Sequence, residues 1–177
     1  MIPWSARRAE ASLDREAFVA VDLSDLVERI CESYRAAAEN MRISAASSPR
    51  IQVYGSAQLL AQLVSNLIDN ALRHAADGGV CDVDLRVEDR LVRLTVRDRG
   101  PGIAASDRES ALRRFVKLDP GRSREGAGLG LPLAAAVAKL HDGSLTLGDA
   151  QPGLEVKLLL PRAGHAAAAV YPARSET

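Results

Sequence analysis

The sequence predicts an α+β fold, in which two or three helices form one layer against four or five mostly antiparallel strands. Three observations favour this class. Apolar residues recur at helical spacing over residues 22–41, 56–75 and 131–140. They alternate, or form short runs, over residues 51–54, 80–87, 91–96, 144–147 and 154–160. A length of 177 residues with 47% apolar content suits one domain with its own core, filled by aliphatic side chains because only 3% of residues are aromatic.

Sequence breaks delimit these elements. The first helix is expected to end before Pro49, the next strand at Gly55, and the second helix at residues 77–79. A turn at residues 88–90 joins two strands as an antiparallel hairpin, and the last strand ends at Pro161. Residues 98–130 are rich in glycine and charge, and a loop of that length within a compact domain is usually functional or disordered.

Composition and charge exclude several classes of protein. The 23 basic residues equal the 23 acidic ones, whereas a nucleic-acid-binding protein needs a basic excess. Cys31 and Cys81 lie in apolar runs without metal-ligand spacing, so we expect two reduced thiols and a cytoplasmic location. No apolar stretch approaches the roughly 20 residues of a membrane span.

The second helix carries the first candidate site. At about 100° per residue, Asn66, Asn70 and Arg73 fall within about 60° of one another, at the border of the apolar arc. Amide oxygens suit Mg²⁺, and an arginine one turn away suits a phosphate. The alternative, that these are solvated residues on a polar helix face, remains equally open from the helix alone.

Two glycine-containing segments are further candidates. In the first, Asp98 directly follows a strand, where its carboxylate can accept from an exocyclic amine, and Gly100 and Gly102 allow backbone to approach a flat ring. An ordinary turn is the alternative. In the second, residues 126–131 open a helix, and glycine-rich backbone at a helix N-terminus binds anions. No Walker-type lysine follows, and no βαβ unit surrounds these glycines.

Taken in this order, the three segments resemble the ATP-binding domain shared by gyrase, Hsp90, histidine kinases and MutL. The strongest resemblance is to the catalytic and ATP-binding domain of bacterial sensor histidine kinases. Residues 66–74 resemble that family's N box, residues 98–103 and 126–131 its two glycine boxes, and residues 112–119 its F box. The resemblance covers roughly residues 20–161. It implies a Bergerat-type fold, with helices on one face of a mixed sheet.

The resemblance also implies a role for each matching residue. Asn70 would coordinate Mg²⁺, with Asn66 assisting, and Asp98 would bind the adenine amine of ATP. Arg114 would stabilise the transferring γ-phosphoryl group. The other expected nucleotide contacts are Arg73, His74, Gly100, Gly102, Ile103, Lys117, Gly126, Gly128, Leu129, Gly130 and Leu131. Charge stabilisation of this kind is most of what phosphoryl transfer needs from a protein.

The reaction implied is transfer of the γ-phosphoryl group to a histidine on a separate dimerisation segment, for signalling to a response regulator. The only histidines are His74, His141 and His165, and none has the acceptor's position upstream of the N box. His141 is expected to be a solvated helix end. Residues 1–20 would be a remnant of the dimerisation helix and linker, residues 21–161 the catalytic domain, and residues 162–177 a flexible tail. The parent protein would then be a homodimer, possibly anchored in the inner membrane, and this chain a monomer.

The sequence departs from the family's pattern at three points, the largest of which is the missing acceptor histidine. Leu112 and Val116 replace common F-box aromatics. Relatives that hydrolyse ATP carry a glutamate general base at the position of Asn66, which an amide cannot replace. The alternative function is a regulatory ATP-binding module, either an anti-sigma-factor-like serine kinase or a degenerate docking domain.

We also expect the loop from about Pro120 to be mobile without nucleotide, because few apolar residues offset its ordering entropy.

Overall fold

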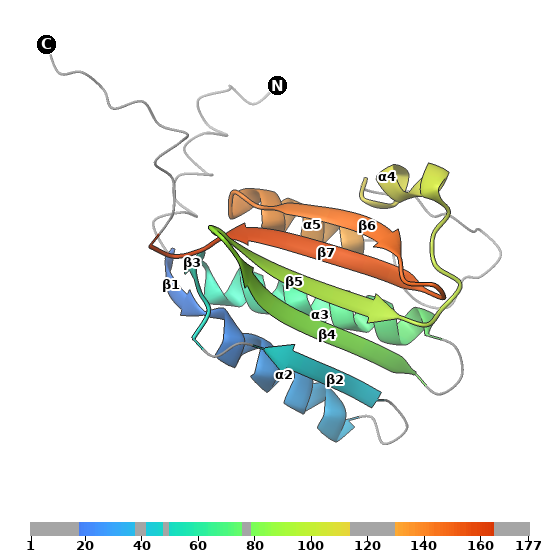
Figure 1. The fold of residues 1–177 in the computed structure, drawn as a ribbon, viewed down its shortest axis with the longest axis horizontal. Helices are drawn as coiled ribbons and strands as arrows, with labels where there is room; N and C mark the ends of the chain where they lie inside the picture. Colours follow the sequence, from blue (N-terminus) through green and yellow to red (C-terminus); the bar gives the residue numbers. More distant parts are fainter. Residues whose placement is uncertain (1–17, 38–41, 48–49, 76–78, 114–129, 165–177) are drawn as a thin grey trace, which may run out of the picture.

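A computed structural model describes residues 18–37, 42–47, 50–75, 79–113 and 130–164. Its main feature is a five-stranded sheet (Figure 1). All neighbouring strands are antiparallel except the pair β2–β4, which is parallel. In spatial order the strands are β2 (Arg42–Ser47), β4 (Val80–Glu88), β5 (Leu91–Asp98), β7 (Leu154–Pro161) and β6 (Ser144–Asp149). The predicted mixed, mostly antiparallel sheet is confirmed.

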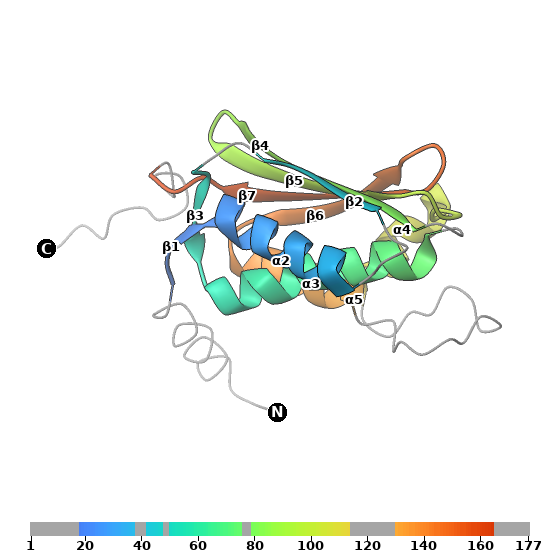
Figure 2. The ribbon, with the colours of Figure 1, turned by 90° about the horizontal axis from the view of Figure 1, so that it is seen from below.

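Three helices cover one face of this sheet, as Figure 2 shows: α2 (Leu23–Ala37), α3 (Ala57–His74) and α5 (Gly130–Leu140). The central helix α3 begins where Ser56 Oγ accepts a hydrogen bond from Leu59 N, 3.4 Å away, which is the usual N-cap contact. Its apolar arc is fully buried between the sheet and the other helices, and consists of Leu60, Leu63, Val64, Leu67, Ile68 and Ala71. The predicted two-layer sandwich is therefore confirmed.

Two strands were not predicted. β1 (Val19–Asp22) pairs antiparallel with β3 (Gln52–Gly55) in a separate two-stranded sheet. β2 occupies residues expected to end the first helix, which instead ends at Ala37. Both strands are short and do not alternate clearly, so only pairing with a distant segment defines them. Phe18 is buried, and Arg162 and Ala163 donate backbone hydrogen bonds to Arg90 and Gln52.

The long loop after β5 contains two short helical segments, a 3₁₀ turn η1 (Ala105–Asp107) and a single helical turn α4 (Arg108–Ala111). Leu112 packs against the core directly after α4. Residues 114–129 lie outside the described part of the chain, and with them the expected mobility from Pro120. In the part of the chain that the structure describes, no helix is long and apolar enough to cross a membrane.

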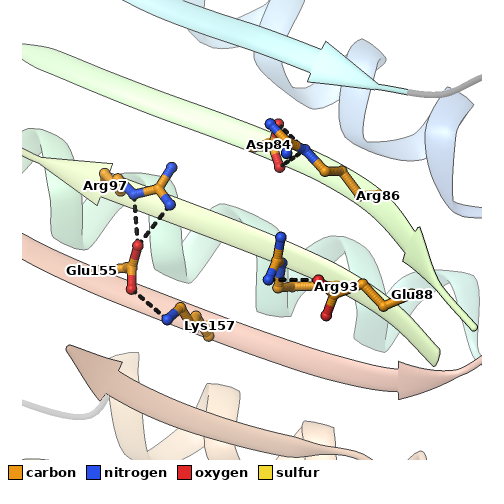
Figure 3. Close-up of polar contacts among 7 residues, drawn as sticks. All are labelled: Asp84, Arg86, Glu88, Arg93, Arg97, Glu155 and Lys157. Carbon is orange, nitrogen blue, oxygen red and sulfur yellow. Dashed lines mark hydrogen bonds and ion pairs between the residues drawn. The ribbon is translucent and has the colours of Figure 1, made fainter.

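The face of the sheet opposite the helices carries charged side chains (Figure 3). Glu155 is the most enclosed of them: its oxygens contact Arg97 Nη2 at 2.7 Å and Lys157 Nζ at 2.8 Å. Burial alone would raise the pKa of Glu155, but hydrogen bonds from Lys157 and Arg97 outweigh it and lower this pKa. Ion pairs on this face join β5 to β7 through Arg97 and Glu155, and β5 to β4 through Arg93 and Glu88.

His141 corrects a sequence-based expectation. We expected a solvated helix end, but the side chain is only 4% exposed. Its Nε2 accepts from Ser56 N at 3.1 Å, and its Nδ1 lies 2.8 Å from the carbonyl oxygen of Val137, so Nδ1 carries the proton. The ring stacks on Phe18 with centroids 4.6 Å apart. His141 therefore ties the end of α5 to the start of α3.

Candidate functional site

The three candidate segments come together along the C-terminal half of α3. A β-carbon placed on Gly100 would overlap the carbonyl oxygen of His74, the last residue of α3, and would lie 3.0 Å from its carbonyl carbon. A β-carbon placed on Gly130, the first residue of α5, would lie 3.9 Å from the backbone oxygen of Asn66. The tertiary structure thus brings together the polar edge of α3, the loop after β5 and the start of α5.

The polar edge of α3 presents its residues with different exposure. Asn66 and Asn70 are partly buried, one helical turn apart, whereas Arg73 and His74 are exposed at the helix end. The Nδ2 atom of Asn66 is buried and has no hydrogen-bond partner among the described residues. Because a buried amide is normally satisfied, this atom is suited to a ligand oxygen.

Asp69, between the two asparagines, is used differently. Its Oδ1 accepts a hydrogen bond of 2.7 Å from the hydroxyl of Tyr34 on α2. Burial, and then this hydrogen bond, raise the pKa of Tyr34 to about 12. Asp69 therefore links α3 to α2, a contact that sequence reasoning did not identify because nothing in the spacing of the two helices indicates it.

Asp98 is the best-defined polar group of the site. It ends β5 and is only 4% exposed. Its Oδ1 accepts two backbone hydrogen bonds, from Gly100 N at 2.8 Å and from Leu154 N at 3.1 Å. Within the described segments, no hydrogen bond to Oδ2 is found. Two donors on one oxygen fix the carboxylate plane, and the second oxygen keeps its capacity to accept from an N–H donor.

The glycines around Asp98 have packing reasons of their own. Gly100 lies against the end of α3, as described above. Gly102 has φ +71°, and a β-carbon there would lie 2.9 Å from the carbonyl oxygen of Gly153 in the β6–β7 turn. We expected both glycines only to let backbone approach a ring, and the structure adds that the protein's own backbone already occupies the space on one side of each.

Gly153 and Leu154 are site residues that sequence reasoning missed. The dipeptide Pro152-Gly153 signalled a turn and nothing more. In the fold, this turn lies against Asp98, since a β-carbon on Gly153 would lie 2.6 Å from the carbonyl carbon of Asp98. No sequence signal links residues 56 positions apart, so only the pairing of β5 with β7 reveals the contact.

The remaining predicted residues divide into two groups. Ile103 packs against the core, and Leu131 is 8% exposed within the core cluster, so any contact of Leu131 with a ligand would involve its backbone. Five others lie outside the described residues: Arg114, Lys117, Gly126, Gly128 and Leu129. Among the described residues, no group of three or more His, Cys, Asp or Glu side chains is arranged to hold a metal ion.

Comparison with known proteins gives a consistent result. The family described as histidine kinase-, DNA gyrase B-, and HSP90-like ATPase matches residues 55–164. The sensor protein kinase PmrB of Pseudomonas aeruginosa is 36% identical over 152 residues, which cover 83% of this chain and 31% of that protein. Among solved structures, the mycobacterial sensor histidine kinase MprB superposes with a TM-score of 0.72 at 29% identity, covering 81% of this chain and 97% of that one. The ATP-binding domain of PrrB from Mycobacterium tuberculosis gives 0.68 at 28% identity, covering 82% and 98%.

Proposed function

Because the chain belongs to the histidine kinase-, DNA gyrase B-, and HSP90-like ATPase family, we propose that it is the ATP-binding catalytic domain of a two-component sensor histidine kinase. The chain spans less than a third of PmrB, so the activity of a whole sensor kinase is part of this proposal. The observation that carries it is the carboxylate of Asp98, which is buried, fixed through Oδ1 and able to accept through Oδ2.

Asp98 suits the exocyclic amine of adenine. An ionised carboxylate is an acceptor only, so it favours a 6-amino purine over a 6-oxo purine, which offers an acceptor at the same position. The loop after β5 also contains Gly100, Gly102 and Ile103, which would form the wall of the purine site. The family match and the likeness to the ATP-binding domain of PrrB support ATP as the nucleotide.

The residues on α3 fit a hydrated Mg²⁺ ion bound with the phosphates. Mg²⁺ takes few protein oxygens, and Asn70 would supply one, with Asn66 next to it. The ion, when bound, would neutralise charge on the β- and γ-phosphates. Asn66 Nδ2, buried without a partner among the described residues, would donate to a phosphate oxygen, and Arg73 at the helix end would contact the phosphates. By resemblance, Arg114 and Lys117 would stabilise the transferring group, while Gly126, Gly128, Leu129, Gly130 and Leu131 would surround the phosphates and His74 the nucleotide.

The phosphoryl acceptor would be a histidine on a dimerisation segment, and a response regulator would receive the group next. Asn66 has no carboxylate to activate water, which favours transfer to an imidazole over hydrolysis. The similarity to sensor kinases favours this function over an anti-sigma-factor-like serine kinase or a docking module. The two buried free thiols, Cys31 and Cys81, support a reducing, cytoplasmic location.

The test is incubation with γ-labelled ATP and Mg²⁺. We expect this chain alone to take up no label, and a purified dimerisation segment bearing the acceptor histidine to take up acid-labile label when the chain is added. Asn70→Ala should abolish that transfer. Gln62→Ala, an exposed amide on the same helix, should leave it unchanged. Acid-labile label on this chain itself, or hydrolysis without transfer, would contradict the proposal.

A further inference from the structure

The β6–β7 turn contacts Asp98 at two points. Leu154 N donates to Asp98 Oδ1 at 3.1 Å, so the turn supplies one of the two hydrogen bonds that orient the carboxylate. One residue earlier, the α-carbon of Gly153 faces the backbone of Asp98: a β-carbon there would overlap the carbonyl oxygen of Asp98 and approach the α-carbon of Arg99 to 3.0 Å. The turn therefore lies too close to Asp98 to leave space for a side chain at position 153.

Gly153 is also fixed from its other side. Its carbonyl oxygen accepts a hydrogen bond from Ala150 N at 3.0 Å, which closes the turn. The same oxygen faces Gly102, where an added β-carbon would lie only 2.9 Å from it. Gly153 itself has φ +113°, a backbone conformation that residues with a side chain rarely adopt. Gly153 thus lies between Asp98 and Gly102, where an added side chain would meet backbone atoms.

We propose that Gly153 is a positioning residue for purine recognition, through which the β6–β7 turn aims Oδ2 of Asp98 at the exocyclic amine of the nucleotide. This inference rests on the proposed function, in which Asp98 binds adenine. A side chain at position 153 displaces Asp98 or the Leu154 N–H, or both. Oδ1 then loses one of its two donors, and the carboxylate plane is no longer fixed.

The position of the turn predicts a selective effect on the base. The proposed phosphate contacts come from α3 and α5, whereas the atoms nearest to a β-carbon on Gly153 belong to Asp98 and Arg99. A change at Gly153 should therefore remove the part of the binding free energy that depends on the 6-amino group. Affinity that arises from the phosphates and the ribose should remain.

The experiment compares ATP with purine riboside triphosphate, which lacks the 6-amino group, by isothermal titration calorimetry with Mg²⁺. Wild-type protein should bind ATP about 10- to 150-fold more tightly, the usual value of a charge-assisted hydrogen bond. Gly153→Ala should reduce this ratio below about threefold, while the affinity for the analogue stays within about threefold. The control is Gly148→Ala in β6, where the new β-carbon would meet Glu155 Oε1 at 3.2 Å, the end of a flexible side chain, and the ratio should be retained.

The outcomes separate this inference from the proposed function. If wild-type protein binds both nucleotides equally, Asp98 does not bind the amine. Adenine recognition by Asp98 in the proposed function and the positioning role of Gly153 are then both wrong. If wild-type protein discriminates but Gly153→Ala keeps the full ratio, or weakens both nucleotides equally, only the positioning role is overturned.

A second measurement decides the matter if Gly153→Ala does not fold. In Asp98→Asn, a neutral oxygen replaces the charged acceptor, so the amide protons of Leu154 and Gly100 should both shift upfield in nitrogen–proton NMR spectra. The Gly148 amide should not move. A Leu154 amide proton that stays in place would show that the turn does not hold the carboxylate, which overturns the proposal.

Discussion

Replacing Asp98 by asparagine tests the binding of the purine with a minimal change of shape. In the structure, Oδ1 accepts from Gly100 N and Leu154 N. An amide oxygen can keep both bonds, so the fold should survive with a loss of about 1 kcal/mol in the free energy of unfolding. The change then falls on the second atom, which becomes a donor and meets the adenine amine donor to donor.

The expected loss of ATP affinity is about 1.5–3 kcal/mol, the value of one charge-assisted hydrogen bond, or about 10- to 150-fold in Kd. Inosine triphosphate carries an oxygen where ATP carries the amine, so its affinity should rise relative to that of ATP in the variant. Calorimetric titration with both nucleotides measures the two effects. The control is Asp89→Asn: Asp89 lies in the turn before β5, at the other end from Asp98, is exposed and has φ +55°, which asparagine tolerates.

Unchanged ATP affinity in Asp98→Asn would refute the reasoning, because the second oxygen would then not face the amine. Equal weakening of ATP and inosine triphosphate would also refute it, since that result indicates general damage to the site. A variant that fails to fold would contradict the structural part of the argument, namely that an amide oxygen satisfies both backbone donors.

Three further predictions follow from the same structure. His141→Ala should lower the free energy of unfolding, measured by urea denaturation, by about 3 kcal/mol, because it removes a buried ring and leaves Ser56 N without its acceptor. As the control, His74→Ala at an exposed position should change this free energy by less than about 0.5 kcal/mol. Glu155→Gln should lower the free energy of unfolding by about 1 kcal/mol at pH 7. Because the pKa of Glu155 is lowered in the folded state, its ionised form stabilises the fold fully at pH values above the unfolded-state pKa near 4.5. The difference in stability between variant and wild type should vanish as the pH falls below the folded-state pKa. Asn70→Ala should remove the Mg²⁺-dependent increase in ATP affinity but leave the affinity measured in excess chelator unchanged, and an equal loss under both conditions would argue against a metal-binding role.

Elements with a strong local signal were predicted closely. The helix expected at residues 56–75 is α3 at Ala57–His74, and the hairpin expected at residues 80–96 is formed by β4 and β5. In both cases the apolar period follows from burial of one face, so a short stretch of chain contains the information. The same holds for Asp98, whose position at a strand end followed from the alternation of β5.

Features that depend on distant pairing were not predicted. β2 exists because it pairs in parallel with β4, and residues 42–47 have no alternation of their own that would indicate a strand. His141 looked like a solvated helix end, because the sequence cannot show that Phe18 and Ser56 lie against its ring. Such contacts join elements far apart along the chain.

The sequence by itself determined the fold class, the order of the nucleotide-binding motifs and the family, because each depends on residue types at short spacing. The tertiary structure decided how those motifs are held in place. Gly100 is required where the loop meets the end of α3, and Gly153 where the β6–β7 turn meets Asp98. The physical reason is that steric exclusion between backbones and the sharing of one carboxylate oxygen by two N–H donors depend on distances in space, and segments 56 residues apart acquire such distances only when β5 pairs with β7.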